Sequence, residues 1–354
     1  MIDLSLFQAH TVELYDLASK SCSIQKVKAR TLLTVRRFDL FAKLFYARNR
    51  VDNPELAIDV YLKHIKAFNP DGKEPGRDDK TTFRCFVETF DSLLDYFQNN
   101  EFDESKSIVP VSSDGIILDG GHRIAALAFY DKEVTIAVFD GVKPVCHFDN
   151  LYFKKRGLPQ NISDIVANEI LQWKSDCLVA CLWPRMGTIT QKETAINLLK
   201  ENTTLFYQKT FDVNLKALTL FVAKVYRKQS WVGTEKNGYI GAMDKALNCY
   251  ERGNTLDLCF FATEQSHEDI LLLKDRIREL FPYDKHSIHI TDDFEETKDI
   301  AYYALESDGI DQWAFAGNVR GWQLLKMRLS EKLYIFKHTT FIKLKSYLAS
   351  IIRW

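Results

Sequence analysis

The spacing of apolar positions separates a helix-rich first part of the chain from a second part in which strands and helices alternate. Apolar residues recur at intervals of three and four in 8–20, 30–49 and 85–100, and this spacing predicts helices. Asn, Pro, Asp and Gly interrupt the pattern in 68–80 and indicate a loop. Residues 150–174 are interpreted as a connection to the second part.

From Asp176 onward, short apolar runs alternate with longer amphipathic segments. The apolar runs predict strands at 177–183, 204–211, 256–262 and 287–291. The amphipathic segments predict helices at 192–202, 215–228, 241–251, 267–280 and 294–307. Helices of this length between strands are typical of a largely parallel sheet, so we expect the fold class to be α/β.

One stretch of the first part, GIILDGGHRIAALAFYDKEVTIAVFDG at 115–141, combines a strand, a glycine turn, an Ala-rich helix and a β-branched strand. Gly120 and Gly121 allow the backbone to turn sharply and to approach a ligand closely. A helix that begins near Ile124 would direct its unpaired amides and the positive end of its dipole toward the turn. This arrangement favours an anionic group, and a phosphate in particular.

The side chains around the two glycines add further chemistry to the turn. Arg123 can give a phosphate two charge-assisted hydrogen bonds, and His122 can donate to a phosphate oxygen or transfer a proton. Asp119, at the end of the predicted strand, could bind a metal ion or act as a base. A tight strand-to-helix connection with a surface salt bridge is the alternative.

Charge is balanced over the whole chain, whose net charge of −1 argues against a surface that binds nucleic acid throughout. The last segment, 319–354, differs because it holds eight Lys or Arg residues and a single acid, Glu331. Aromatic residues are interleaved with these cations, so this predicted helical tail could contact an anionic membrane surface or nucleic acid. A packed helix pair with a solvated basic face is the alternative.

The cysteines and the apolar runs bear on location. The seven cysteines are scattered and odd in number, which is typical of reduced thiols in a cytosolic protein. The N-terminus lacks the apolar core of a secretory signal, and the longest apolar runs are far shorter than a membrane span. We therefore expect a cytoplasmic protein, with peripheral contact to the inner face of the membrane through 319–354 as an open addition.

The stretch VPVSSDGIILDGGHRIAALAFYDKEVTIAVF, 109–139, resembles the ParB/sulfiredoxin superfamily, whose members carry a strand, a Gly-rich turn ending in His-Arg or Arg-Arg, and an Ala-rich helix. Upstream, 61–70 is similar to the first strand and following loop of that superfamily. Residues 86–111 are similar to its next helix and the segment leading into the strand before the turn. The resemblance covers 56–148 and implies a ParB/sulfiredoxin-like α+β domain.

Branches of the superfamily make different predictions for this chain. Sulfiredoxins repair oxidised peroxiredoxin with the cysteine of a Gly-Cys-His-Arg turn, and Gly121 stands at that position, which argues against this activity. ParB proteins bind CTP and DNA, but the region after Lys155 shows no clear helix-turn-helix dimer module. Free-serine kinases carry Asp-Gly-His-Thr-Arg, and Asp119 and Arg123 match both ends of that motif. The resemblance therefore implies that ATP or another nucleotide, with Mg²⁺, places its phosphates at Gly120–Arg123.

In the kinases of this superfamily, a glutamate from the loop after the first strand accepts the proton of the substrate hydroxyl. Glu74 lies in the matching loop and is the predicted base, with Asp71 and Asp119 as rivals. His122 lies next to Arg123 at the phosphate turn, where a nearby anion favours its charged, donating form. Basic residues of the loop are candidates for neutralising phosphate, namely Lys73, Arg77 and Lys80. A solvated loop without such a role is the alternative.

The second part offers a possible second site at the ends of its predicted elements. Its candidates are Trp231, Lys245, His289 and Asp292, because ligands of open α/β sheets bind beyond the carboxyl ends of the strands. The run TDDFEE at 291–296 also fits a helix start in which Thr291 has a structural role and acids occupy the first turn.

These observations combine into four predicted regions. They are an N-terminal helical segment at 1–55, a ParB/sulfiredoxin-like nucleotide-binding domain at 56–150, an α/β domain at 151–318 as a possible acceptor-binding or second catalytic domain, and the basic aromatic helical tail at 319–354. The second part also resembles uncharacterised bacterial proteins found with surface-polysaccharide synthesis.

Together, the predicted regions indicate a kinase-like phosphotransferase that acts on a small hydroxyl compound, a sugar being one candidate. A ParB-like nucleotide-gated DNA-binding protein or nuclease is the alternative. A scaffold with a degenerate nucleotide site is a third possibility.

Overall fold

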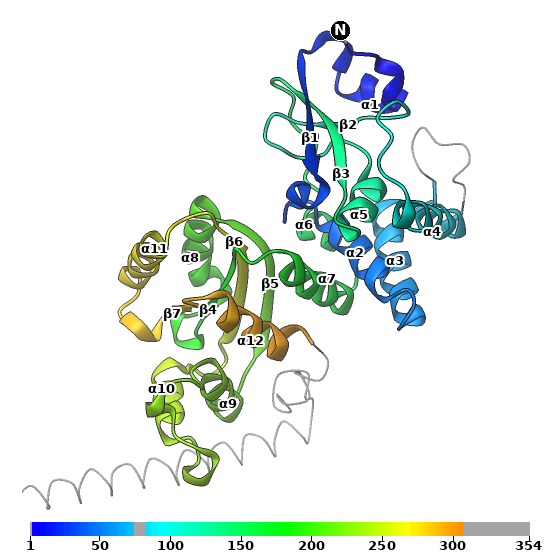
Figure 1. Cartoon of the computed structure of the whole chain (residues 1–354). Coiled ribbons are helices and arrows are strands. Elements are labelled where there is room, and N and C mark those ends of the chain that lie inside the picture. The colour runs from blue at the N-terminus through cyan, green and yellow to red at the C-terminus, as the bar shows by residue number, and fades with distance from the viewer. Residues whose placement is uncertain (1, 74–81, 307–354) are drawn as a thin grey trace, which may run out of the picture. The chain divides into compact units, whose positions relative to one another are not determined.

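The computed structural model describes residues 2–73 and 82–306, and the chain divides into two compact units, Met1–Ser175 (unit 1) and Asp176–Trp354 (unit 2) (Figure 1). The division comes later than the predicted boundary at 150, because the segment interpreted as a connection forms α6 (Asn150–Lys155) and α7 (Gln160–Trp173) within unit 1. α7 buries Val166 and Ile170 and packs against α2 (Phe38–Asn49). The basic tail at 319–354 lies outside the described residues.

Unit 1 contains a mixed, three-stranded sheet in the order β1-β3-β2. β1 (Cys22–Lys28) pairs antiparallel with β3 (Glu133–Phe139), and β2 (Val109–Val111) pairs parallel with β3. β1 was not predicted, because its mostly exposed side chains give no apolar alternation. It also shows that the N-terminal segment, predicted to be helical, contributes an edge strand to the sheet of the following region.

α2 packs against three other helices of unit 1, and its residues are buried without interruption from Phe38 to Ala47. Contacts join α2 to α3 (Pro54–Phe68), α5 (Gly121–Phe129) and α7. α4 (Phe83–Asn99) packs against α3 and α5, and α1 (Ala9–Leu14) lies near the N-terminus. The helix predicted at 85–100 is confirmed by α4, whereas 30–49 becomes helical mainly from Phe38 onward.

Residues 61–70, matched to the first strand of the ParB/sulfiredoxin superfamily, are not a strand. They form the second half of α3 and its end. The buried positions Tyr61, His64 and Ile65 are spaced by three and one, as on one face of a helix, and continue the face begun by Ala57 and Val60. The structure therefore contradicts this element of the resemblance.

Unit 2 has a four-stranded sheet in the order β5-β6-β4-β7. β4 (Cys177–Leu182) pairs antiparallel with β6 (Thr255–Ala262) and with β7 (Ile288–Ile290), and β5 (Thr204–Asp212) pairs antiparallel with β6. All four strands occur where the sequence predicted them, but the prediction of a largely parallel sheet is wrong. β4 and β5 run parallel to each other, as do β6 and β7, yet each of these pairs is separated by a strand of the opposite direction.

This topology is two interleaved split β-α-β units, the arrangement also called ferredoxin-like. The crossover helices α8 (Ile189–Asn202) and α11 (His267–Glu279) cover one face of the sheet and bury a core of aliphatic side chains and Phe261. α9 (Leu215–Val225) and α12 (Phe294–Leu305) contact each other, and α12 packs on β4 (Figure 1). α10 (Ile240–Cys249) packs against α9.

The described helices bear on the membrane question as well. None of those in 2–73 and 82–306 is both long and apolar enough to cross a membrane. None of the seven cysteines, all of which lie among the described residues, forms a disulfide, and Cys177, Cys181, Cys249 and Cys259 are buried. Burial raises the pKa of the Cys259 thiol to about 12, which favours the protonated form of this side chain.

Candidate functional site

The glycine turn leads directly into α5. Gly120 caps the helix in the left-handed region with φ of +81°, a conformation that favours glycine, and the helix starts at Gly121. The first hydrogen bond within the helix joins Ile124 N to the Gly120 carbonyl at 2.9 Å. The amides of Gly121 and Arg123 therefore point out of the helix end. α5 begins at Gly121, three residues before the predicted start near Ile124, so Gly121 belongs to the first turn of the helix.

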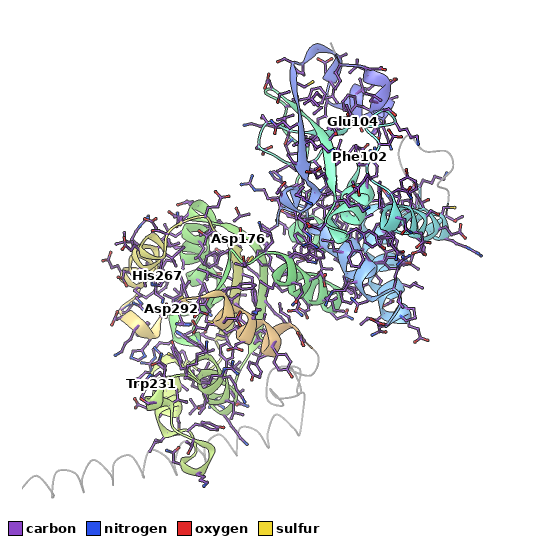
Figure 2. The ribbon with its side chains drawn as sticks, in the orientation of Figure 1. Phe102, Glu104, Asp176, Trp231, His267 and Asp292 are labelled. Atoms are coloured by element: carbon purple, nitrogen blue, oxygen red, sulfur yellow. The ribbon has the colours of Figure 1, made fainter. Side chains whose placement is uncertain are left out.

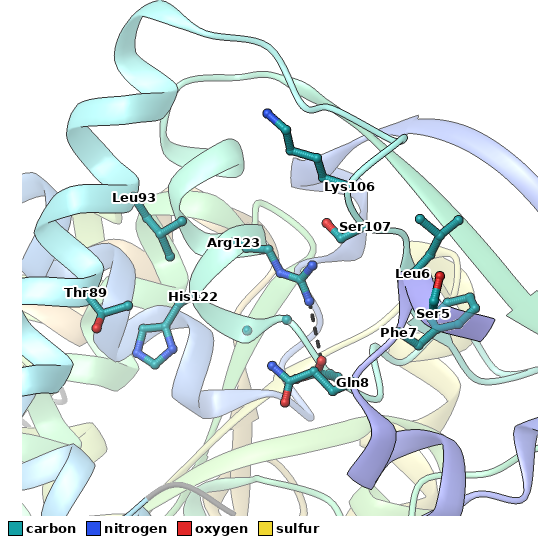
Figure 3. A pocket seen from close by; sticks show the side chains of 13 residues that line it. Ser5, Leu6, Phe7, Gln8, Thr89, Leu93, Lys106, Ser107, His122 and Arg123 are labelled. Atoms are coloured by element: carbon teal, nitrogen blue, oxygen red, sulfur yellow. Dashed lines mark hydrogen bonds and ion pairs between the residues drawn. The ribbon is translucent and has the colours of Figure 1, made fainter. Parts of the chain in front are cut away.

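A pocket of about 400 Å³ opens at this helix end. It is lined by the turn and by side chains from the N-terminal segment, α4 and the loop before β2: Ser5, Leu6, Phe7, Gln8, Thr89, Leu93, Lys106, Ser107, Asp119, Gly120, Gly121, His122 and Arg123. Figure 3 shows Arg123 extending between Ser107 and Gln8, and His122 extending toward Thr89. The structure thus places the four predicted phosphate-binding residues of the turn and Asp119 in one cavity.

Arg123 and Asp119 form a loose ion pair across the first turn. Nη2 of Arg123 lies 3.4 Å from Oδ2 of Asp119, and both side chains are about one-fifth exposed, at 21% and 22%. A pair with this spacing and solvent access is weak, so Arg123 can turn toward a bound anion at little cost. Lys106, the other cation of the pocket, forms an exposed pair with Asp103 at 3.1 Å and can also be redirected.

His122 is held from behind by a buried tyrosine. Its Nε2 lies 2.8 Å from the Tyr61 hydroxyl, which also lies 3.2 Å from the carbonyl of Phe86. The carbonyl can only accept, so the hydroxyl donates to it and accepts from Nε2–H. The imidazole edge meets the Phe90 ring with centroids 5.2 Å apart. Nε2 of His122 is therefore engaged by Tyr61.

Beneath the turn lies a buried group of three charges on and beside α2. Arg37 donates to both carboxylate oxygens of Asp39 at 2.7 and 2.8 Å, and Lys43 donates to Asp39 Oδ2 at 2.8 Å. Burial alone would raise the pKa of Asp39, but the two cations outweigh it and hold the pKa far below its usual range. Arg37 also donates to the Ile117 carbonyl at 2.6 Å, which ties the group to the segment before the turn.

Gly121 packs directly onto this charged group. A Cβ at this position would lie 3.2 Å from Nη2 of Arg37 and 3.4 Å from Oδ2 of Asp39. The second glycine of the turn therefore provides room for buried charges as well as access to a ligand. Sequence reasoning missed the group, although two charges four positions apart in the otherwise apolar run FDLFAKLF were a visible signal.

Other candidates of the first part are placed differently or lie outside the described residues. Lys73 is exposed, does not line the pocket, and its backbone amide donates to Oδ1 of Asp71 at 3.3 Å. The predicted base Glu74 lies outside the described residues, as do Arg77 and Lys80. Among the described residues, no cluster of three or more His, Cys, Asp or Glu side chains could hold a metal ion alone.

In unit 2, the structure brings together three of the four residues of the possible second site. Trp231, His289 and Asp292 line one pocket of about 220 Å³ (Figure 2 labels Trp231 and Asp292). Lys245 does not line that pocket; its Nζ donates to the Lys285 carbonyl at 2.5 Å. Glu296 was missed by the sequence analysis, although its oxygen lies 2.8 Å from Nε2 of His289.

The structural role considered for Thr291 is confirmed, but it is not the expected helix cap. Its hydroxyl accepts from the Val179 amide at 3.0 Å and pairs with the Thr297 hydroxyl at 2.8 Å. Asp293 instead caps α12, because its side chain accepts from the Glu296 amide. Thr291 therefore joins β4 to α12.

Comparison with known proteins gives no family for this chain. No protein-family model matches it, and no curated protein matches it. The ParB/sulfiredoxin resemblance therefore remains a prediction, and a function has to be argued from the geometry of the sites.

Proposed function

We propose that unit 1 binds a nucleotide by its phosphates at the start of α5 and transfers a phosphoryl group to a small hydroxyl compound. The observation that carries the proposal is the Gly120–Gly121 turn, which opens the N-terminus of α5 into a pocket of about 400 Å³ beside Arg123. A helix N-terminus combined with a nearby guanidinium is a favourable site for phosphate.

The charges around the pocket support an anionic ligand. Lys106 and Arg123 line it against one carboxylate, that of Asp119. The buried group below adds the charges of Arg37 and Lys43 against that of Asp39. The buried group therefore carries one excess positive charge, and so do the lining residues themselves, with Lys106 paired to Asp103 outside the lining. The positive end of the α5 dipole adds to these charges.

Separate roles follow for the residues of the turn. Arg123 binds and stabilises the transferred phosphoryl group, while His122, whose Nε2–H is engaged by Tyr61, donates to phosphate from Nδ1 in its charged form, which a bound phosphate favours. Mg²⁺ bound with a nucleotide needs only one or two protein carboxylates in addition to phosphate oxygens, and Asp119 is the carboxylate in the pocket that fits this role. The magnesium ion would neutralise charge that develops between the phosphates.

The acceptor and its base complete the proposal. Glu74 is proposed as the proton acceptor, with Asp71 and Asp119 as rivals, and it lies outside the described residues. The acceptor is proposed to be a sugar used in surface-polysaccharide synthesis. A ParB-like nucleotide-gated DNA-binding protein or nuclease remains the alternative to be separated by experiment.

Calorimetry with ATP, ADP and CTP in the presence of Mg²⁺ tests the binding step. Arg123→Ala should weaken binding by about 1.5–3 kcal/mol, or roughly 10- to 150-fold, because a hydrogen bond to a charged group is lost. Arg84→Ala is the matched control, since Arg84 lies on the exposed surface of α4, pairs there with Glu88 and does not line the pocket. Absence of binding to all three nucleotides would contradict the proposal.

Turnover measurements over a panel of sugars test the chemical step. Glu74→Gln should abolish phosphoryl transfer with nucleotide affinity nearly unchanged, whereas His122→Ala should weaken nucleotide binding first. Near-normal turnover of Glu74→Gln would transfer the role of base to Asp71 or Asp119. A parallel gel-shift assay with plasmid DNA tests the alternative function. DNA binding or cleavage without acceptor-stimulated turnover would favour a ParB-like DNA-binding protein or nuclease.

A further inference from the structure

The pocket of unit 2 contains a histidine with a fixed orientation. His289 is only 6% exposed, and its Nε2 lies 2.8 Å from Oε1 of Glu296. The other carboxylate oxygen of Glu296 accepts from the Asp292 amide at 2.9 Å, which fixes the carboxylate in turn. Because a carboxylate accepts and does not donate, the hydrogen of a neutral imidazole lies on Nε2 and the lone pair on Nδ1.

That lone pair is accessible from the pocket. Nδ1 makes no hydrogen bond to another described residue. It is also not among the fully buried polar atoms without a partner in the described residues, so part of its surface is exposed. The Tyr226 ring lies against the imidazole with centroids 5.0 Å apart. His289 therefore presents a hydrogen-bond acceptor of defined direction to a molecule in the cavity.

An aromatic surface stands beside this acceptor. Trp231 lines the pocket, is 45% exposed and packs against Tyr226 with ring centroids 5.2 Å apart. A large exposed aromatic ring supported by a second ring is suited to stacking against a flat, partly apolar ligand face. The faces of sugar rings have this character, since C–H groups cover them while hydroxyls project from the edges.

The charge and the volume of the pocket further restrict the class of ligand. The lining has four carboxylates, those of Asp292, Asp293, Glu296 and Asp299, against two cations, Arg227 and Lys228. Arg227 is paired with Asp299 at 2.6 Å, and Lys274, from outside the lining, pairs with Asp292 at 3.2 Å. Asp293 and Glu296 then remain against Lys228, so the pocket disfavours anions such as phosphates and carboxylates. Its volume of about 220 Å³ is below the ~300–1,000 Å³ usual for drug-sized ligands.

We propose that this pocket is a binding site for one neutral sugar ring, which stacks on Trp231 while one of its hydroxyls donates to Nδ1 of His289. Glu296 is a positioning residue, because it holds the imidazole tautomer and does not itself face the ligand hydroxyl. The site belongs to unit 2 alone. It stands whether or not unit 1 binds a nucleotide, and it names the chemical class that unit 2 recognises.

Saturation-transfer NMR and calorimetry on the full chain, without nucleotide, test the site. The ligands are methyl glycosides of neutral hexoses and N-acetylhexosamines, with glucuronate and hexose 6-phosphate as anionic counterparts. Neutral glycosides should bind and the anionic ones should bind at least about tenfold more weakly. Binding of no neutral glycoside, or preferred binding of the anionic ones, would overturn the proposal.

Variants distinguish this site from binding elsewhere on the surface. Trp231→Ala should lower affinity about tenfold and Trp231→Phe should restore most of it, because stacking needs only an aromatic face. Tyr283→Ala is the control, since Tyr283 is a part-exposed ring that contacts Arg185 outside the pocket. Equal affinity of Trp231→Ala and the unaltered chain would exclude the site, and this readout uses a surface position that does not threaten folding.

The role of His289 has its own test. His289→Phe keeps a ring in the same place but removes the acceptor, so it should weaken binding of a complete sugar. A series of monodeoxy glycosides should contain one member whose affinity is the same for His289→Phe and the unaltered chain. If every deoxy sugar loses affinity equally in both proteins, Nδ1 does not receive a ligand hydroxyl. Glu296→Gln should show a smaller loss than His289→Phe, as a positioning residue requires.

Discussion

Both units bury a lysine against an aspartate, but only the pair of unit 1 lies directly against a candidate site. In unit 1, Lys43 and Arg37 surround Asp39, and Gly121 of the candidate phosphate turn rests on that group. In unit 2, Lys192 of α8 contacts Asp257 of β6 at 2.5 Å, and Asp257 also accepts from the Thr210 hydroxyl.

The position of each pair relative to its pocket explains the contrast. Lys192 lies on the sheet face covered by α8 and α11. Asp257 of β6 points to the same face, because it is two and four residues from Cys259 and Phe261, which belong to the core on that face. His289 points to the opposite face, because its neighbours Ile288 and Ile290 belong to the same core. A buried ion pair can therefore support a site directly, as in unit 1, or stabilise only the scaffold, as in unit 2.

The largest expected effect comes from removing the central carboxylates. Asp39→Asn and Asp257→Asn should each lower the free energy of unfolding by about 3–5 kcal/mol, because buried cations lose their partner. Only Asp39→Asn should also weaken nucleotide binding, since it loosens the support of the turn. Denaturant unfolding and calorimetry on the folded fraction measure both quantities. Equal loss of nucleotide affinity in the two variants would remove the distinction between the units.

A buried histidine gives unit 1 an expected sensitivity to acid. His64 is 0% exposed, and neither ring nitrogen has a hydrogen-bond partner among the described residues. Burial, with Lys43 and Arg37 nearby, holds its pKa well below the usual value of 6.5. The unfolded chain takes up the proton first as pH falls, so the folded state loses about 1.4 kcal/mol per pH unit below about 6.5.

The titration of Asp39 does not contribute to the pH dependence of stability between pH 7 and pH 5. Its pKa is lowered in the folded protein, so its contribution is fully present above about pH 4 and is lost only at lower pH. His64→Leu should therefore flatten the stability profile between pH 7 and pH 5, as measured by denaturant unfolding, while His147→Leu at an exposed position should not. An unchanged slope for His64→Leu would show that other groups cause the acid sensitivity.

The smallest expected effect compares two glycines with the same backbone conformation. Gly120 and Gly115 both have φ of +81°, so alanine at either position should reduce stability by about 1 kcal/mol. A Cβ at Gly120 would lie 3.0 Å from Nη2 of Arg123, whereas none of the described atoms lies within 4 Å of one at Gly115. Gly120→Ala should therefore reduce nucleotide affinity and Gly115→Ala should not. Equal affinities would mean that Arg123 does not contact the ligand from its present position.

Local patterns in the sequence determined much of the secondary structure and one of the two pockets in outline. The strands and helices after Asp176 lie where apolar spacing predicted them, because burial on one face imposes a period that can be read directly. The glycine turn was also visible, since Gly120 needs a conformation that few other residues adopt and the candidate side chains follow within three positions.

Tertiary structure alone decided the strand order of unit 2 and the convergence of polar groups from different elements. The alternation of strands and helices is the same for a parallel sheet and for interleaved split β-α-β units, so only the pairing of β6 between β4 and β5 distinguishes them. His289 and Glu296 meet because β7 ends beside the start of α12, and Gly121 meets Arg37 because α5 packs on α2. Such contacts depend on which surfaces pack together after the elements have formed, and spacing along one segment carries no information about its partner.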